Sequence, residues 1–282
     1  MTNLEQKRKA DAFRALHSGG EALLLPNAWD VASARIVEES AYPAVATTSA
    51  GIAFSLGYPD GQKITKEEML ATVARIARAV KVPVTADVES GYGKTPEHAA
   101  QTASAVVEAG AVGMNLEDVS GDSTRPLVEL PLQLEKIRAV REAAGRQNVP
   151  LVLNARTDVY LLQVGDPLKR YDEAVLRLRA FRDAGADCVF VPGLRDLSVI
   201  ARLVTDLHCP VNILAGPGSP SIPELRKVGV ARISLGSGPM RATLGLLRRL
   251  AAELKTSGTY SAMEGAPSHA EMNELMKPKS EN

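Results

Sequence analysis

Short apolar runs rich in Val, Ile and Leu recur along the chain, and helical patterns fill nearly every gap between them. Glu67–Val80 and Tyr171–Ala184 are two such patterns, with apolar residues at three- and four-residue spacing. Eight runs have the length and composition of strands: Leu23–Asn27, Ala44–Ser49, Pro83–Val88, Gly113–Asp118, Leu151–Thr157, Cys188–Gly193, Val211–Ala215 and Arg232–Gly236. Strands that alternate with helices predict a parallel sheet covered by helices.

Three of the helix-to-strand junctions have similar sequences, which are EAGAVGMNLED, DAGADCVFVPG and KVGVARISLG. In each, a glycine just past the helix suits the left-handed backbone that ends many helices. Eight strands with intervening helices in about 240 residues predict a closed (β/α)8 TIM-type barrel of the α/β class. An open doubly wound sheet is the alternative. The barrel is favoured because Pro26-Asn27-Ala28-Trp29-Asp30 follows the first strand, in place of a Gly-x-Gly-x-x-Gly loop.

The two ends of the chain add elements to this barrel. An extra amphipathic helix is expected before the first strand, and residues 1–255 are expected to form one barrel domain. Residues 256–282 read as a tail with one short helix over Ser268–Lys277. An apolar stripe on that helix has no barrel gap to fill, and consists of Met272, Leu275 and Met276. We therefore expect the tail to pack on a neighbouring subunit.

Charge and composition narrow the classes of partner. Lys plus Arg and Asp plus Glu both total 33, so the formal net charge is zero. Binding to nucleic acid or to an anionic membrane needs an excess of positive charge, so neither partner is expected. The apolar runs are much shorter than the roughly 20 residues of a membrane helix, and no apolar signal-peptide core precedes them. We therefore expect a cytoplasmic protein.

Carboxylates gather where the predicted strands end. Asp87 and Glu89 lie two apart on one strand, which predicts that both side chains point to one face, and Glu117 ends the adjacent strand. Three converging acids repel one another unless a positive charge lies among them. Oxygen ligands favour a hard cation, so the pattern predicts a Mg²⁺ site. The alternative is a structural ion network with Arg156, the one cation at a strand end.

Other strand-end residues could bind an anionic substrate. Ser49, with the backbone of Ala50 and Gly51, could donate hydrogen bonds to a carboxylate, although Ser49 could also simply fill a barrel layer. Arg156 beside a metal would suit an enolate oxygen. Asp60 lies in a Pro/Gly loop, where an ordinary turn residue is the alternative. None of the four histidines falls at a strand end, so neither a histidine-ligated zinc nor a Ser-His-Asp triad is expected.

Taken together, the strand ends resemble the isocitrate lyase/phosphoenolpyruvate mutase superfamily. The matching segments run in order over about residues 5–255, and each is weak alone. They are Leu25-Pro26-Asn27-Ala28-Trp29-Asp30, Thr48-Ser49-Ala50-Gly51, Gly57-Tyr58-Pro59-Asp60-Gly61, Ala86-Asp87-Val88-Glu89-Ser90-Gly91-Tyr92-Gly93, Asn115-Leu116-Glu117-Asp118 and Asn154-Ala155-Arg156-Thr157-Asp158. The resemblance implies cleavage or formation of a bond beside a 2-oxo acid, through a pyruvate-type enolate, with Mg²⁺ as cofactor and Mn²⁺ as the alternative ion.

The resemblance also implies which residues bind the metal, which bind the substrate and which are catalytic. Asp60, Asp87, Glu89 and Glu117 would hold the metal and its waters, while Ser49, Ala50, Gly51, Arg156 and Asn212 would bind the substrate. Arg156, Asp60 and Glu117 are the candidate catalytic residues. Members of the superfamily are typically tetramers that exchange a C-terminal helix, which agrees with the apolar stripe in the tail.

The chain departs from the superfamily where particular reactions are specified. Lyases carry a Lys-Lys/Arg-Cys-Gly-His segment in the loop after the fourth strand, whereas residues 119–126 read VSGDSTRP. The Lys and Asn that mutases bring in this loop are also missing. Thr47 stands where an aromatic residue is expected, and strand six ends in Pro192-Gly193, where lyases have a Glu.

Four functions follow from these observations. The leading one is a Mg²⁺-dependent lyase-type enzyme that cleaves a C–C bond next to a 2-oxo acid, as a decarboxylase or a retro-aldol lyase acting on a small 2-oxo or 2-hydroxy carboxylate. The second is C–P chemistry on phosphonopyruvate-like substrates, and the third is a non-catalytic 2-oxo acid binding protein. The fourth is a sugar-phosphate enzyme that uses Gly216–Ser219 and Gly236–Gly238 as its phosphate site, although such a site needs no acidic cluster.

Overall fold

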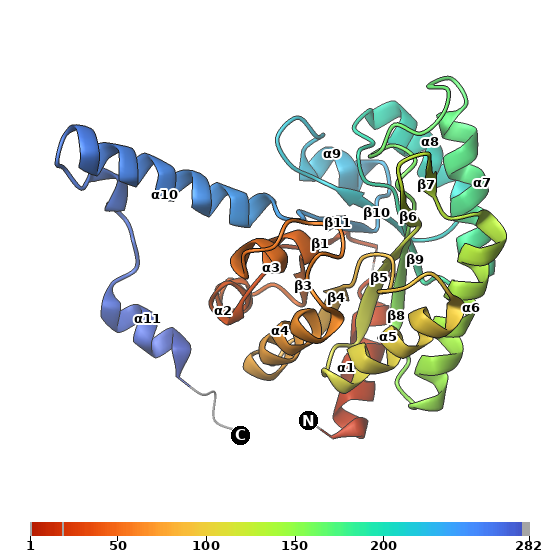
Figure 1. Ribbon diagram of the computed structural model, residues 1–282, viewed down its shortest axis with the longest axis horizontal. Helices are drawn as coiled ribbons and strands as arrows, with labels where there is room; N and C mark the ends of the chain where they lie inside the picture. Colours follow the sequence, from red (N-terminus) through yellow and green to blue (C-terminus); the bar gives the residue numbers. More distant parts are fainter. Residues whose placement is uncertain (1, 19, 278–282) are drawn as a thin grey trace.

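The computed structural model describes residues 2–18 and 20–277, and within them nine parallel strands form one sheet that curls into a barrel (Figure 1). The strand order around the barrel is β1-β11-β10-β9-β8-β5-β4-β3-β2. The strands are β1 (Leu23–Leu25), β2 (Asn27–Ala28), β3 (Val45–Thr47), β4 (Val84–Asp87), β5 (Gly113–Glu117), β8 (Val152–Arg156), β9 (Cys188–Phe190), β10 (Val211–Leu214) and β11 (Arg232–Ser234). The predicted barrel is confirmed.

The first predicted strand is divided in two, and this division completes the barrel. β1 pairs with β11, and β2 pairs with β3, so one stretch of chain joins both ends of the strand order. Pro26 lies between them and has no N–H to donate to a ladder. Asn27 ties the junction together, because its Nδ2 donates to Thr47 O at 2.8 Å and its Oδ1 accepts from the Leu235 and Gly236 N–H groups, both at 2.8 Å.

Helices surround the sheet in the alternating order that the sequence predicts. They are α1 (Asn3–Ala15), α2 (Val31–Glu39), α3 (Ser49–Ser55), α4 (Lys66–Ala79), α5 (Pro96–Glu108), α6 (Leu130–Arg146), α7 (Arg170–Asp183), α8 (Leu197–Leu207), α9 (Ile222–Lys227), α10 (Gly238–Thr256), the 3-10 turn η1 (Ser261–Met263) and α11 (His269–Met276). The two helices predicted from apolar spacing are α4 and α7. Ser49 was expected at the end of a strand, but it begins α3 because Thr48 caps that helix by accepting from Gly51 N–H.

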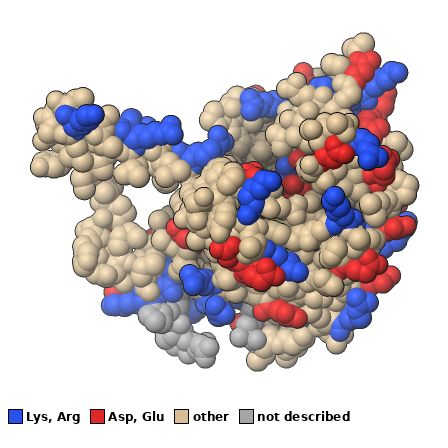
Figure 2. Space-filling model, in the orientation of Figure 1, with Lys and Arg blue, Asp and Glu red and all other residues tan. Residues whose placement is uncertain are grey.

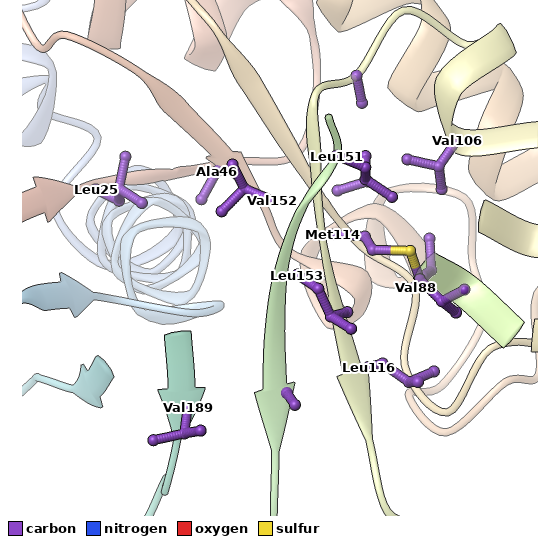
Figure 3. Packing of buried hydrophobic residues seen from close by; sticks show 14 of the residues in the cluster. Leu25, Ala46, Val88, Val106, Met114, Leu116, Leu151, Val152, Leu153 and Val189 are labelled. Atoms are coloured by element: carbon purple, nitrogen blue, oxygen red, sulfur yellow. The ribbon is translucent and has the colours of Figure 1, made fainter. Parts of the chain in front are cut away.

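The apolar core lies between the strands and the surrounding helices. Figure 3 shows Met114 of β5 beside Val88, on the side of the sheet that Val106 of α5 occupies. The expected N-terminal helix, α1, is present, and its Phe13 is fully buried. A Cβ on Gly113 would lie 2.8 Å from the Phe13 ring, so only glycine leaves room for this ring in β5. α1 therefore packs against the amino-terminal side of the barrel strands.

The loop expected after Glu117 contains regular structure. β6 (Val119–Asp122) and β7 (Arg125–Leu127) pair as an antiparallel hairpin. Asp122 Oδ1 stabilises the turn by accepting from Thr124 N–H at 2.8 Å and from Thr124 Oγ1 at 2.7 Å. This hairpin stands at the carboxyl end of β5, next to the predicted site.

The C-terminal elements extend away from the barrel as a limb of α10, η1 and α11 (Figures 1 and 2). In α10 only Met240 is buried. Leu247 is 57% exposed and Leu254 is 45% exposed. α11 returns toward α2 of the same chain, where Arg35 Nη1 donates to Leu275 O and to Lys277 O, both at 2.5 Å. None of the helices in the described residues is both long enough and apolar enough to cross a membrane.

Candidate active site

Asp87 stands at the last position of β4 and is 9% exposed. Its Oδ2 accepts from Ser49 N–H at 3.1 Å and from Ser49 Oγ at 2.8 Å, so the first turn of α3 is fastened to this carboxylate. The Asp87 N–H donates to Thr47 Oγ1 at 2.9 Å, which gives a hydrogen-bonding role to the position where an aromatic residue was expected. Asp87 Oδ1 is buried and has no partner among the described residues.

Glu89 lies in the same region as Asp87, but its backbone conformation differs from the one predicted. β4 ends at Asp87, and Glu89 has a left-handed backbone with φ of 53°, so the prediction that both acids point to one face of a strand was wrong. The Glu89 carboxylate accepts from Gln62 N–H at 2.6 Å through Oε2, whereas its buried Oε1 has no partner among the described residues. Burial, together with the charges of Asp87 and Asp60, raises the pKa of Glu89 to about 8.

Arg156 joins two acids at the ends of β5 and β8. Its Nη1 lies 2.8 Å from Glu117 Oε2, while its Nε and Nη2 donate to the two oxygens of Asp158 at 2.5 and 2.7 Å. β5 and β8 pair in register, with Glu117 opposite Arg156, which brings the ion pair together. Burial raises the pKa of Glu117, and the Arg156 charge opposes that shift. The ion network with Arg156 is therefore present, but it includes only Glu117 of the three predicted acids.

A second group of polar residues, centred on Asp118, holds Asp158 in place. Asp118 is fully buried and accepts from Thr157 Oγ1 at 2.7 Å, from Asp158 N–H at 3.0 Å and from Arg177 Nη1 at 3.2 Å. Burial raises the pKa of Asp118 to about 6, against the opposing effect of these donors. Because Asp118 binds the backbone of Asp158, it fixes the residue that orients Arg156.

The remaining predicted site residues lie around this centre. Asp60 is exposed in the loop after α3, and partial burial of its carboxyl group, with the charge of Asp87, raises its pKa. Ala50 and Gly51 are buried in the first turn of α3, where a Cβ on Gly51 would come within 2.5 Å of Thr48 Cγ2. Asn212 is fully buried on β10 and exchanges hydrogen bonds with Ser234 Oγ at 3.3 Å.

The barrel interior holds a charge that sequence reasoning missed. Arg232 on β11 is 1% exposed, and its Nη2 donates to Asn115 Oδ1 at 3.5 Å. Its Nε and Nη1 have no partner among the described residues. Burial lowers the pKa of Arg232 to about 10, while the negative charge of Asp87 acts in the opposite direction. A cation therefore lies inside the barrel, within the electrostatic reach of the acidic site.

Two further residues at the barrel mouth lie in the matching segments but were given no role from the sequence. Asp158 could have been found, because it stands two positions after Arg156 at a strand end. Tyr92 has a left-handed backbone with φ of 51° and a buried hydroxyl without a partner among the described residues. Burial, followed by the charges of Glu89 and Asp87, raises the pKa of Tyr92. Only the folded backbone shows that this hydroxyl lies close to the acids.

The donor set suits a hard cation that keeps part of its water shell. Among residues 2–18 and 20–277, no three His, Cys, Asp or Glu side chains form a ready-made metal cage. The buried oxygens without partners, Asp87 Oδ1 and Glu89 Oε1, nevertheless belong to two adjacent acids. Mg²⁺ commonly takes only one or two carboxylates and retains waters, so these acids fit such an ion without forming a closed cage.

The sequence of residues 13–255 matches the model of the phosphoenolpyruvate phosphomutase family. The chain belongs to this family. A solved structure from Burkholderia cenocepacia J2315, provisionally assigned as a lyase/mutase, is 39% identical, with 96% of each chain covered and a TM-score of 0.90. The 2-methylisocitrate lyase of Salmonella typhimurium is 27% identical over 257 residues, which are 88% of this chain and 85% of that enzyme.

A third similar protein has a known ligand. Oxaloacetate acetylhydrolase in complex with its product oxalate is 27% identical to this chain, with 95% of this chain and 93% of the other covered and a TM-score of 0.84. Lyases, a hydrolase and mutases thus share this barrel. Family membership fixes the fold, and it leaves the reaction of this chain open.

Proposed function

We propose that this family member is a cytoplasmic Mg²⁺-dependent lyase that cleaves a C–C bond next to a 2-oxo acid, as a decarboxylase or a retro-aldol enzyme. The observation that carries the proposal is the pair of buried carboxylates, Asp87 and Glu89, at the same barrel mouth as Arg156; each has an oxygen without a partner in the described part of the chain. Buried acids next to a fixed guanidinium, with the pKa of Glu89 raised, are arranged for negative charge that forms during a reaction.

Asp87 and Glu89 would hold the metal, with Glu117 and Asp60 contributing directly or through waters. Bound Mg²⁺, or Mn²⁺ in its place, would polarise the substrate's carbonyl oxygen. The chain itself supplies hydrogen bonds to Asp87 from Ser49 and to Glu89 from Gln62 N–H, which keep both carboxylates in place. Such supporting contacts typically matter for metal affinity by factors of about 10–100.

Arg156 would stabilise the oxygen of the pyruvate-type enolate left by bond cleavage. Asp158 binds it through two hydrogen bonds, so its guanidinium is oriented before the substrate arrives. The first turn of α3, from Ser49 to Gly51, would receive the substrate's carboxylate, and Asn212 would line the pocket. The raised pKa values of Asp60 and Glu117 suit both groups to carry a proton during the reaction.

Chemistry at a C–P bond is the second candidate. The matching family is that of a phosphomutase, and the β6–β7 hairpin carries Arg125, whose side chain is 77% exposed at the barrel mouth. An exposed guanidinium on this hairpin could bind a phosphonate. The Lys and Asn expected of mutases are absent from the hairpin, which favours C–C cleavage.

A thermal-shift experiment tests the proposed site. We expect oxalate to stabilise the protein only when Mg²⁺ is present, because oxalate resembles the planar enolate of pyruvate. At about 100 times its Kd, a ligand specific for the folded state adds about 2.7 kcal/mol. Absence of any metal-dependent stabilisation would refute the proposal. Detection of pyruvate by NMR after incubation with oxaloacetate or phosphonopyruvate would then distinguish C–C cleavage, C–P cleavage and binding alone.

Replacing Glu117 tests the metal assignment. We expect Glu117→Gln to weaken Mg²⁺ binding by roughly tenfold or more, since a carboxylate at the site is lost and Arg156 loses one of its two acids. Calorimetry on the metal-free protein measures the effect. Glu129→Gln, at the exposed N-cap of α6, is the matched control and should leave Mg²⁺ affinity unchanged. Equal affinity in both variants would remove Glu117 from the metal site.

We also propose that the chain forms a homotetramer in which C-terminal helices are exchanged between subunits. The support is the limb described above, whose longest helix, α10, leaves four leucines exposed: Leu244, Leu246, Leu247 and Leu254. Exposed apolar surface of this kind is typical of subunit interfaces.

A further inference from the structure

The segment 88–93, which follows β4, has an unusual backbone. Glu89 and Tyr92 are non-glycine residues with φ of 53° and 51°, and Gly91 and Gly93 between and after them have φ of 89° and 157°. Left-handed backbone at non-glycine residues is costly, and it persists only where surrounding groups hold it. Because Glu89 is a proposed metal ligand, the contacts that hold this segment also decide where its carboxylate lies.

Lys136 of α6 makes the central contact with this segment. Its Nζ donates to Ser90 O at 2.5 Å and lies 3.5 Å from Gly93 O. One ammonium therefore contacts backbone carbonyls on both sides of Tyr92. Thr102 Oγ1 of α5 adds a hydrogen bond to Gly91 O at 2.8 Å. Three carbonyls of four consecutive residues are thus held by side chains from two helices.

Within the described residues, the ammonium of Lys136 has no counter-ion in contact with it. The residue is 1% exposed, and no carboxylate in the described parts of the chain lies within 4.0 Å of its ammonium. A buried ammonium costs free energy unless its donors are used, and the acceptors here are the two backbone carbonyls. Burial lowers the pKa of Lys136 to about 8, while the charges of Glu117 and Asp118 act in the opposite direction.

On the side that faces the β6–β7 hairpin, segment 88–93 borders a cavity and is not held by packing alone. A cavity of about 470 Å³ separates Ser90 and Gly93 from the β6–β7 hairpin, and Lys136 also lines it. One turn before Lys136, Gln133 Nε2 donates to Glu117 O at 3.2 Å. The same side of α6 therefore contacts the backbone at both Glu117 and the segment that carries Glu89.

We infer that Lys136 is a positioning residue for the metal site, which it serves by holding the 88–93 backbone so that Glu89 faces the metal. The inference rests on the proposed metal-binding function. Lys136 itself touches neither metal nor substrate in this assignment. It acts through the carbonyls of Ser90 and Gly93, and its removal should change where Glu89 lies more than it changes the rest of the barrel.

Calorimetric titration of Mg²⁺ and Mn²⁺ into the metal-free full-length protein tests this role. Lys136→Met keeps the length of the side chain and removes both hydrogen bonds, and we expect the metal Kd to rise roughly 10- to 100-fold. Thr102→Val removes only the neutral hydrogen bond to Gly91 O, and we expect a smaller rise in the same direction. Hydrogen exchange at residues 88–93 should become faster in both variants.

Arg141→Met is the matched control, because Arg141 lies on the same helix and also binds backbone carbonyls. Its Nη1 donates to Leu151 O at 2.5 Å, at the opposite end of the barrel, and it pairs with Asp187. We expect this variant to lower the melting temperature and to leave the metal Kd unchanged.

The outcomes separate this inference from the proposed function. If the wild type binds no metal, the proposed function fails. If the wild type binds metal and Lys136→Met binds it equally well, only the positioning role is overturned. The role is also overturned if Arg141→Met raises the Kd as much as Lys136→Met does, because the effect then follows general stability. A rise in Kd for Lys136→Met without faster hydrogen exchange at residues 88–93 would show that the backbone has not been released, and would likewise overturn it.

Discussion

Single residues with buried charges set the electrostatics of this barrel. Asp87 and Glu89 lie at the mouth, Arg232 lies in the interior, and the guanidinium of Arg232 is 5.8 Å from the Phe13 ring. His17, just after α1, contacts that ring edge-on with the centroids 4.9 Å apart. Each charge therefore affects the ionisation of its neighbours, from the proposed metal site down to the N-terminal helix.

His17 should make the protein sensitive to acid. Burial, and then the charge of Arg232, lower its pKa from 6.5 to about 4. The folded protein thus favours the neutral ring, so this stability is complete above about pH 6.5 and is lost as the pH falls toward 4, by about 3 kcal/mol in all. We expect His17→Gln to flatten the fall in melting temperature between pH 6.5 and 4.5. A fall as steep as that of the wild type would show that other groups cause the acid sensitivity.

At the scale of single elements, the short helix α3 forms the part of the site expected to receive a carboxylate. Its first turn begins directly after β3, Thr48 caps it, and Ser49 ties it to Asp87. Gly51 leaves room for this arrangement, since a Cβ there would lie 2.5 Å from Thr48 Cγ2 and 3.0 Å from Trp29 Cβ. A small residue is needed because two side chains pack directly against the helix backbone.

We expect Gly51→Ala to lower the stability by about 1–3 kcal/mol through overpacking and to weaken Mg²⁺-dependent oxalate binding. Chemical denaturation and thermal shift measure the two effects. Gly145→Ala in α6 is the control, because a Cβ at Gly145 meets nothing within 4 Å. That substitution should raise stability by up to about 1 kcal/mol. The packing explanation would be wrong if Gly51→Ala were as stable as the wild type.

At the scale of the whole molecule, the barrel and the C-terminal limb differ in how they are stabilised. The barrel has two clusters of buried apolar residues, whereas α10 buries only Met240 and α11 buries no residue completely. Figure 2 shows the limb as a projection with Lys and Arg along it and much uncharged surface. In the proposed tetramer, a second copy of the chain would cover the exposed leucines of this limb and so stabilise it.

Leu247→Glu should therefore shift the protein toward smaller species in analytical ultracentrifugation, because a charge would be buried in the proposed interface. Leu168→Glu is the matched control: Leu168 is 90% exposed and lies outside the limb, so this change should leave the sedimentation coefficient unaltered. A wild-type protein that sediments as a monomer would refute the tetramer. Equal sedimentation of the wild type and Leu247→Glu would remove this face of α10 from the interface.

The sequence by itself determined the order of the barrel strands and of the main helices between them, because apolar spacing depends on which face of each strand or helix is buried. It indicated neither α3 nor the β6–β7 hairpin. It also placed Asp87, Glu117 and Arg156 at strand ends, since the carboxyl ends of parallel strands meet at one end of a barrel. The family resemblance that these strand ends carried is confirmed by the match over residues 13–255.

Only the tertiary structure decided how the site is held together. The left-handed turn at Glu89, the pairing of Arg156 with Asp158 and the contact of Lys136 with Ser90 O are set by the packing of the chain in space. Lys136 is 46 residues away from Ser90 in the sequence, and it reads there as an ordinary charged helix residue. Such contacts cannot be deduced from local patterns, because they depend on distances that exist only once the barrel has closed.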